Sequence, residues 1–256
     1  MADPVLRPPS TAGGQSLEQV LVARVRERAD PRLGDHAYVH LRDLRDAVAA
    51  SLRDVAGTWL DYGAGTSPYR DLLPGATVVT ADLPGGERYR VDLELDASGA
   101  CPVPDMTFDG VLSTQVLEHV TDPVGYLREA HRVLRPGGRL VLSTHGVWEE
   151  HGGQDLWRWT ADGLALLAGQ AGFADVSVRR LTADARAVLL LFRRQGRAAQ
   201  WPAGGVVGLL LRLARYWDRL RPEAFDRYCD EHFRGVGGEQ LFYIAVLLEA
   251  RRRDQR

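Results

Sequence analysis

The sequence contains no lysine, so all 32 of its basic residues are arginine. Without a lysine amine, the chain excludes Schiff-base catalysis, the lysine grip of a phosphate-binding P-loop and a lysine-assisted dehydrogenase site. Cysteine is scarce too. Its two cysteines, Cys101 and Cys229, are too few for a disulfide framework or a zinc finger, and they fit a reducing compartment.

Long apolar runs and a net positive charge are also missing. No stretch reaches the roughly 18 uninterrupted apolar residues that a membrane span needs. Residues 1–16 carry proline, glycine and serine without an apolar run, which predicts a disordered tail rather than a signal peptide. The net charge of −2 gives no bulk electrostatic case for nucleic-acid binding. We therefore expect a cytoplasmic protein with no nucleic-acid partner and no stable membrane insertion.

The apolar pattern predicts strands that alternate with helices. Such alternation is typical of an α/β fold, here a seven-stranded, mostly parallel sheet with helices on both faces. The predicted helices cover residues 17–29, 37–55, 123–135 and 160–171. The first predicted strand follows Gly57 and runs into the glycine turn at Gly63, and the others cover residues 77–81, 88–92, 108–113, 139–144, 173–181 and 241–248.

We expect one domain over residues 17–256, with two N-terminal helices in 17–56, a ligand-binding core in 57–181 and the last strand in 241–251. Residues 182–240 are too long for an ordinary connection. Apolar residues recur at helical spacing from Val206 to Leu220, which predicts a helical insertion between the sixth and seventh strands. It is expected to cover the ligand side of the sheet or to form a homodimer contact.

A glycine turn follows the first predicted strand. Gly63 and Gly65 would let the backbone approach a ligand closely, and the carboxylate of Asp61 could accept hydrogen bonds from a cationic or hydroxylated ligand. A dinucleotide fingerprint needs a third glycine where Pro68 stands. The pattern is instead D-x-G-x-G-x-S, which disfavours a nicotinamide-dependent oxidoreductase.

Polar side chains stand at the ends of four predicted strands: Asp61, Asp82, Ser113 and His145. In open α/β sheets, ligands bind beyond the carboxyl ends of the parallel strands. The four positions together predict a ligand site at that edge of the sheet.

Three further segments accompany the glycine turn in order. They are the Pro102–Asp109 run, the Leu117–Val120 tetrapeptide L-E-H-V with its following Asp-Pro, and the Arg132–Gly138 run R-V-L-R-P-G-G. Together these motifs resemble the "type 11" class I methyltransferases that depend on S-adenosylmethionine (SAM). The resemblance implies the Rossmann-like fold of class I methyltransferases, and SAM as the cofactor.

The resemblance also implies which residues bind SAM. Asp61, Gly63 and Gly65 would hold its methionine part, and Gln115 would line the methionine pocket. The family's next motif glycine is Ser67 here. Three parts of the nucleoside are assigned as well: the ribose hydroxyls to Asp82, the adenine face to Leu83, and the adenine edge to Asp96 or Ala97.

Methyl transfer is an in-line displacement at a sulfonium carbon, and the acceptor often needs a general base. The segment after the fifth strand carries His145 and His151, the candidate bases. The acidic residues around them could help to hold a divalent metal. Their spacing fits no fixed ligand motif, so the sequence predicts no metal.

Asp155, Trp157 and Arg158 are predicted to contact the acceptor. The runs Thr66–Arg70 and Asp155–Thr160 resemble a subgroup linked to tailoring of sugars and natural products. The predicted function is therefore O-methylation of a small molecule, at a hydroxyl of a sugar or glycosylated natural product. N- or C-methylation of a small molecule, or a non-catalytic scaffold that keeps the fold, are the alternatives.

Overall fold

The computed structural model describes residues 17–35, 37–84, 90–151, 154–198, 220–233 and 240–253, with Leu209, Leu213 and Tyr216 between them. The predicted tail at 1–16 and most of the predicted Val206–Leu220 stripe lie outside the described residues. The proposed division of the chain into a single domain therefore stays a prediction.

Seven strands form one sheet in the order β3-β2-β1-β4-β5-β7-β6. The strands β1 to β5 pair in parallel, whereas β7 runs antiparallel to both of its neighbours, β5 and β6. The predicted seven-stranded, mostly parallel sheet is confirmed. Its strands are β1 (Gly57–Tyr62), β2 (Ala76–Asp82), β3 (Leu93–Glu94), β4 (Phe108–Thr114), β5 (Leu134–His145), β6 (Phe173–Ala183) and β7 (Tyr243–Arg252).

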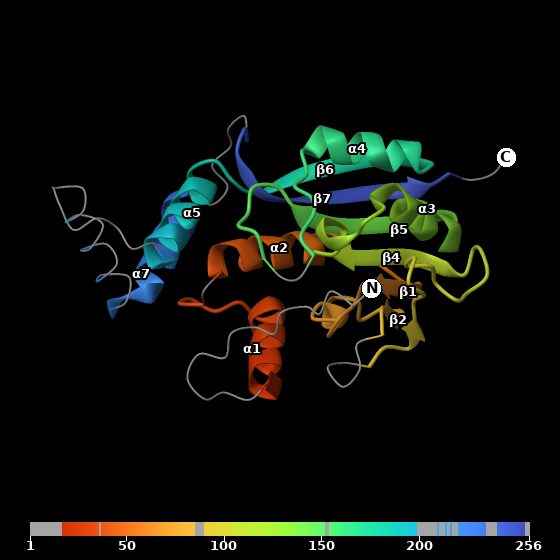
Figure 1. The fold of residues 1–256 in the computed structure, drawn as a ribbon, viewed down its shortest axis with the longest axis horizontal. Helices are drawn as coiled ribbons and strands as arrows, with labels where there is room; N and C mark the ends of the chain where they lie inside the picture. The colour runs from red at the N-terminus through yellow and green to blue at the C-terminus, as the bar shows by residue number, and fades with distance from the viewer. Residues whose placement is uncertain are drawn as a thin grey trace.

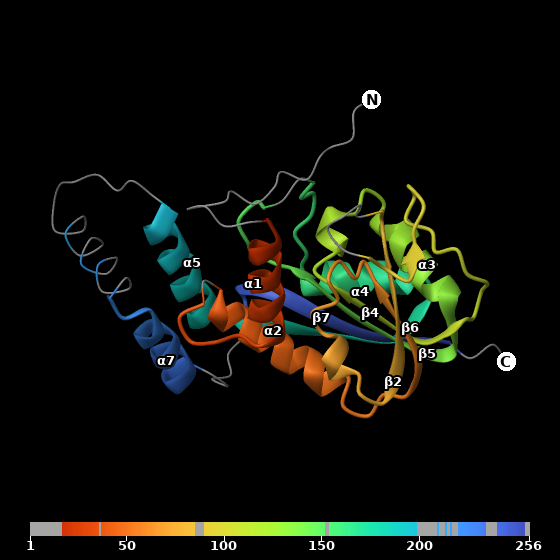
Figure 2. The same ribbon diagram turned by 90° about the horizontal axis from the view of Figure 1, so that it is seen from below.

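Helices cover both faces of this sheet (Figure 1, Figure 2). The helices α3 and α4 pack on one face and α2 packs on the other, with α1 beside α2. The helical elements are α1 (Leu17–Ala29), α2 (Tyr38–Ser51), α3 (Pro123–Val133), α4 (Ala161–Gln170), α5 (Ala185–Ala198) and α7 (Pro222–Phe233), with the 3-10 turns η1 (Arg70–Leu72) and η2 (Leu117–His119).

The core divides into two layers because successive strand side chains point to opposite faces. On β1, Leu60 and Tyr62 pack with the apolar sides of α3 and α4. Trp59 points the other way and packs with Leu44 and Val48 of α2. The sheet is thus buried on both faces and leaves its edge at the strand ends as the place for a ligand.

Several predicted boundaries differ from the structure. The third strand is Leu93–Glu94, not 88–92, of which 88 and 89 are outside the described residues. The predicted helix 123–135 ends at Val133, because Leu134 is already extended and pairs with Phe108 of β4. The last strand begins at Tyr243 rather than 241.

Two helix starts are confirmed by their hydrogen bonds. The side chain of Asp122 accepts from the backbone N–H of Gly125 at the start of α3, where Pro123 occupies the first helical position. The hydroxyl of Thr160 accepts from the N–H of Gly163 at the start of α4. Each cap satisfies an amide that the helix itself leaves unpaired.

The helical insertion is confirmed in its described part. Figure 1 shows α5 and α7 side by side, beyond the end of the sheet at which β5 ends with His145. Cys229 of α7 packs on Tyr38 and Val39 of α2. Leu190 of α5 packs on Ile244 of β7. Within the described residues, α7 thus packs on α2 and α5 packs on β7, each through a small apolar cluster.

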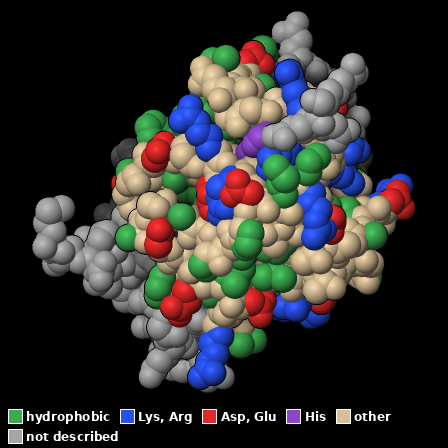
Figure 3. Space-filling model, turned by 90° about the vertical axis from the view of Figure 1, so that its right-hand side faces the viewer, with side chains coloured by type: hydrophobic (Ala, Val, Ile, Leu, Met, Phe, Trp, Pro, Cys, Tyr) green, Lys and Arg blue, Asp and Glu red, His purple; other side chains and the backbone are tan. Residues whose placement is uncertain are grey.

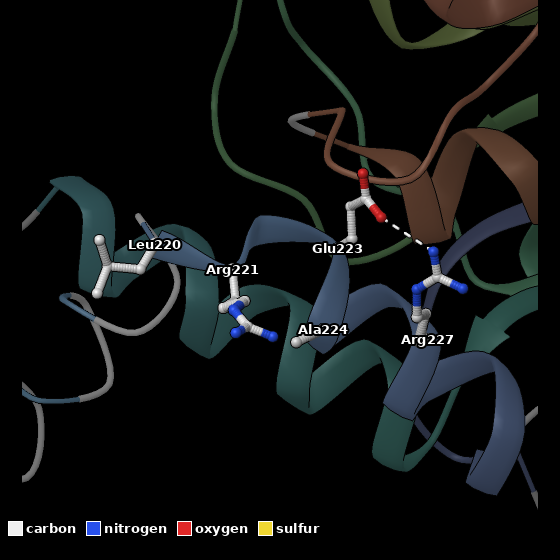
Figure 4. Close-up of a pocket in the computed structure, with 5 residues that line it drawn as sticks. All are labelled: Leu220, Arg221, Glu223, Ala224 and Arg227. Carbon is white, nitrogen blue, oxygen red and sulfur yellow. Dashed lines mark hydrogen bonds and ion pairs between the residues drawn. The ribbon is translucent and has the colours of Figure 1, made fainter.

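The face of the molecule drawn in Figure 3 carries charges of both signs. Figure 3 shows acidic and basic side chains interspersed over one face of the molecule rather than gathered into a basic stripe. A hollow at the start of α7 is lined by Leu220, Arg221, Glu223, Ala224 and Arg227 (Figure 4). The hollow contains an exposed ion pair between Glu223 and Arg227, and none of the predicted site residues lines it.

Of the helices in the described ranges, none has both the length and the apolar character to span a membrane.

A buried ion pair joins α5 and α7 of the insertion. Arg193 of α5 donates to Asp226 of α7 at 2.6 Å, and both side chains are buried. The other oxygen of Asp226 accepts from the N–H of Gly34 in the loop before α2, at 2.8 Å. Asp226 thus ties α5, α7 and the N-terminal helices together.

Asp226→Ala should lower the free energy of unfolding by about 3–5 kcal/mol, because the buried guanidinium of Arg193 would lose the carboxylate that neutralises it. Glu223→Ala is the matched control on the same helix. It breaks the exposed pair with Arg227, which is worth about 0–1 kcal/mol. Urea unfolding followed by circular dichroism measures both. Equal losses in the two variants would contradict this account of the insertion.

Candidate active site

The glycine turn after β1 leaves its backbone open on one side. Gly63 and Gly65 have φ angles of +76° and +52°, in the region that glycine adopts most readily. The turn is anchored to β2, because the N–H groups of Gly63 and Ala64 donate to the carbonyl of Ala81 at 2.8 and 3.1 Å. A Cβ on Gly63 would lie 2.6 Å from a methyl of Val116, whereas one on Gly65 would meet no described atom within 4 Å.

Asp61 lies one residue before the end of β1 and is buried. Its Oδ2 accepts from the hydroxyl of Ser67 at 2.6 Å. Burial raises the pKa of Asp61 to about 6, and the Ser67 hydrogen bond only partly offsets this rise. A carboxylate held in so poorly solvated a place would be stabilised by a cationic ligand group.

Asp82 closes the same turn from the end of β2. Its Oδ2 accepts from the N–H of Gly65 and its Oδ1 from the N–H of Leu83, both at 2.7 Å. These two hydrogen bonds fix the carboxylate at the turn, on the side of Gly65. The side chain of Leu83 is half exposed beside it. Asp61, Gly63, Gly65 and Asp82 are therefore brought together around one turn.

Asp96 and Ala97 lie in the loop that follows β3. The Oδ1 of Asp96 accepts from the N–H groups of Ser98 and Ala100 and from the Ser98 hydroxyl, at 2.6 to 3.0 Å. These hydrogen bonds lower the pKa of Asp96 and fold the loop around its carboxylate. The loop is tied to β1, since the hydroxyl of Tyr62 donates to the carbonyl of Gly99 at 2.5 Å.

Gln115 directly follows β4 and has a φ of 56°. Its backbone N–H donates to the Ser143 carbonyl at 2.9 Å, and its side-chain amide donates to the Ser143 hydroxyl at 3.2 Å. The buried amide oxygen has no hydrogen-bond partner in the described part of the chain. Gln115 thus fastens the end of β4 to β5, next to the turn of Gly63.

His145 is the last residue of β5 and is buried. Its ring stacks on Trp148, with ring centroids 5.4 Å apart, and its Nε2 lies 3.5 Å from Oε1 of Glu118. Burial, helped by neighbouring His40 and His151, lowers the pKa of His145 well below the usual range. The imidazole is therefore neutral at neutral pH and carries one nitrogen lone pair.

His151 lies next to His145, with ring centroids 4.9 Å apart and an edge-to-face arrangement. Its Nδ1 is 3.2 Å from Oδ2 of Asp155, and its backbone N–H donates to the same oxygen at 2.9 Å. Burial lowers the pKa of His151, although the Asp155 carboxylate opposes that shift. The structure therefore brings the two predicted bases together.

Asp155 and Arg158 contact each other. The two terminal nitrogens of the Arg158 guanidinium, Nη1 and Nη2, each donate to one oxygen of the Asp155 carboxylate at 2.6 Å. The side chain of Asp155 is almost fully buried. Arg158 also donates to the carbonyls of Trp148 and Glu149. Trp157 is partly exposed and donates its indole N–H to the carbonyl of Val120 at 2.7 Å. These three residues shape the loop after β5.

Sequence reasoning missed Glu118 and His40. Glu118, in η2, is fully buried and accepts from the Thr144 hydroxyl at 2.8 Å. Burial raises its pKa. His40 comes from α2, and its ring centroid lies 5.7 Å from that of His145. The L-E-H-V motif contained a signal for Glu118, whereas nothing in the sequence brings His40 to this place.

Comparison with known proteins places this geometry in a fold class. A SAM-dependent methyltransferase from Thermotoga maritima superimposes with a TM-score of 0.52 at 14% sequence identity, covering 91% of this chain and 96% of that one. The fold is the Rossmann-like methyltransferase fold that the sequence predicted.

The sequence comparison is more specific within the core. Residues 60–142, from β1 into β5, match the family described as methyltransferase domain. A protein of Mycolicibacterium smegmatis, named a probable SAM-dependent methyltransferase, is 42% identical over 131 residues, which cover 46% of this chain and 49% of the relative. A ubiquinone biosynthesis O-methyltransferase of Ruegeria pomeroyi is 36% identical over 98 residues, covering 33% and 40%.

The chain thus covers half or less of the length of these two curated relatives. Residues 60–142 thus resemble the methyltransferase domain family, and both relatives are named as methyltransferases. The predicted sugar and natural-product subgroup stays a prediction.

Asp61→Asn should stabilise the ligand-free protein at about pH 7.5. A carboxyl whose pKa is raised in the folded state favours folding only below its unfolded pKa, and this contribution is lost as the pH rises through about 6. At about 1.4 kcal/mol per pKa unit, the neutral amide should gain about 2–3 kcal/mol above that pH and almost nothing near pH 4.

Urea unfolding of wild type and variant at the two pH values measures this difference. Asp71→Asn, the same change at an exposed position of η1, is the control and should shift stability by less than about 0.5 kcal/mol. A gain for Asp61→Asn that is equal at both pH values would contradict the role of burial.

Proposed function

We propose that this protein transfers the methyl group of SAM to a small-molecule acceptor, most favourably to a hydroxyl oxygen. The observation that carries the proposal is the open glycine turn, with Asp61 and Asp82 at the two flanking strand ends. It lies inside the segment that matches the methyltransferase domain family. A scaffold protein would have no need of so costly a buried carboxylate as Asp61 beside an open turn.

SAM carries a cationic ammonium group, and Asp61 offers a buried carboxylate for it beside the backbone of Gly63 and Gly65. The ribose hydroxyls are assigned to the carboxylate of Asp82, and the adenine face to the half-exposed Leu83. Asp96 or Ala97 reaches the adenine edge, and Gln115 lines the methionine side.

The acceptor approaches from the end of β5. Its oxygen attacks the methyl carbon, the bond from that carbon to sulfur breaks, and sulfur keeps the electron pair as S-adenosylhomocysteine forms. The acceptor hydroxyl must lose a proton in the process. The neutral imidazoles of His145 and His151 lie at this edge and are assigned to its activation.

The acceptor class is a sugar hydroxyl on a glycan or natural product, on the support of the Thr66–Arg70 and Asp155–Thr160 runs. The name of the Ruegeria pomeroyi relative, an O-methyltransferase, supports oxygen as the acceptor atom. Transfer to nitrogen or carbon would appear in the product of the same assay. A cytoplasmic location stays a prediction.

Part of the insertion covers the acceptor side. The guanidinium of Arg194 in α5 lies 4.5 Å from the ring centroid of Trp148, and the side chain pairs with Glu149. Both partners belong to the loop that follows β5. This contact favours acceptor recognition over the alternative role of a homodimer contact for α5.

The function is tested by calorimetry with SAM and S-adenosylhomocysteine, followed by transfer of a labelled methyl group to panels of sugars, phenols and amines. We expect binding of both cofactor forms and a labelled O-methyl product. If neither cofactor form binds, the proposal fails. Binding without transfer to any panel member would favour the scaffold alternative.

Gly65→Ala should weaken SAM binding by about tenfold or more, which corresponds to about 1.4 kcal/mol. The new methyl group points into space that no described atom fills, so it would meet the ligand. Gly169→Ala in α4 is the control, because its Cβ also meets no described atom and lies away from the turn. Calorimetry with SAM measures both, and unchanged affinity in Gly65→Ala would refute the placement of SAM at this turn.

A further inference from the structure

Three potential metal ligands converge at the end of β5. Glu118 comes from η2, His145 from the last position of β5 and His151 from the loop that follows. One ligand atom of each lies within 4.8 Å of the others. Two imidazoles and one carboxylate are a donor set common among transition-metal sites in proteins.

Glu118 supplies an independent sign of a missing partner. Its side chain is fully buried, and Oε2 accepts from the Thr144 hydroxyl. In the described part of the chain, Oε1 has no hydrogen-bond partner and instead faces Nε2 of His145 at 3.5 Å. A buried carboxylate oxygen without a partner is costly, so such an oxygen usually has a cation or a proton beside it.

The two histidine rings are held in position by their neighbours. Asp155 lies 3.2 Å from Nδ1 of His151 and is itself fixed by Arg158. A carboxylate on one imidazole nitrogen orients the ring and leaves the other nitrogen for a metal. His145 is oriented by its stack on Trp148. The supports that a metal site requires behind its ligands are therefore present.

We propose that Glu118, His145 and His151 bind one divalent transition-metal ion. Metal–ligand bonds of about 2.0–2.2 Å place neighbouring donor atoms about 3–3.5 Å apart. The separation of 3.5 Å between Glu118 and His145 already fits, and His151, whose ligand atom lies within 4.8 Å of the other two, would have to move closer by at most about 1.3–1.8 Å. The imidazoles favour Zn²⁺ or Fe²⁺ over Mg²⁺, Ca²⁺ or Mn²⁺, which prefer oxygen ligands.

The sequence predicted no metal because its spacing matched no motif. The reason is that the ligands come from two separate segments, and Glu118 stands 27 positions before His145. The acidic residues in the loop after β5 have partners other than a metal. Asp155 supports His151, and Glu149 pairs with Arg194.

The role of the metal rests on the proposed function. Bound to the acceptor hydroxyl, a divalent cation lowers the pKa of that group and promotes its nucleophilic form. The metal ion keeps its oxidation state, and the proton of the acceptor hydroxyl passes to solvent. His145 and His151 would then activate the acceptor hydroxyl as ligands of the metal ion, rather than by taking its proton directly.

Metal binding is tested on the full chain without a histidine tag, after dialysis against a chelator. We expect one equivalent of Zn²⁺ to bind in calorimetry, and Co²⁺ to give the visible absorption of a low-symmetry site. His151→Gln and Glu118→Gln should each weaken binding by about 10–100-fold. His151→Gln changes a partly exposed residue, so the test holds even if Glu118→Gln fails to fold.

Matched controls are His131→Gln and Glu129→Gln. His131 packs on Phe173 and Glu129 pairs with Arg132, both on α3 and outside the cluster. They should bind the metals as wild type does. The proposal is overturned if the wild type binds no metal, or if both cluster variants bind metal as tightly as the wild type. The buried Glu118 oxygen would then carry a proton instead of facing a metal ion. SAM calorimetry on the metal-free protein separates the cases, because SAM binding without metal binding leaves the proposed function standing.

Discussion

The close approach of Gly63 to Val116 is the contact on which the candidate site depends. A side chain at Gly63 would overlap Val116, so only glycine lets the turn after β1 lie against the segment after β4. Val116 stands two positions before Glu118, so the same contact sets the distance between the glycine turn and the polar cluster of Glu118, His145 and His151 at the end of β5. Methyl transfer requires donor and acceptor about 3–3.5 Å apart, and a spacing set by backbone packing varies little.

Local sequence patterns predicted most of the fold because its strongest elements are marked locally. The buried strands β1 and β2 and the capped starts of α3 and α4 carry their own signals. The errors lie where distant pairing decides. Leu134 continues a helical pattern but pairs with Phe108, and the two-residue β3 exists only through Ala81 and Asp82 of β2.

The site was predictable to the extent that it lies at strand ends. Asp61 and Asp82 follow from the rule that ligands bind beyond the carboxyl ends of parallel strands. Glu118 was not predicted as a site residue because its complete burial is a property of packing, which the short motif L-E-H-V does not show. The contact of Asp155 with Arg158 was also invisible, since a carboxylate three residues before an arginine fits a substrate contact equally well.

The position of β7 has a consequence for how the chain folds as it is made. β7 lies between β5 and β6, and among the described strands β6 pairs with β7 alone. A nascent chain on the ribosome therefore carries β6 without a strand to pair with until residues 243–252 have emerged. The parallel half, with the glycine turn and the β4–β5 edge, can assemble earlier, so the exposed edge of β5 is a transient hazard for aggregation that chaperones would have to cover.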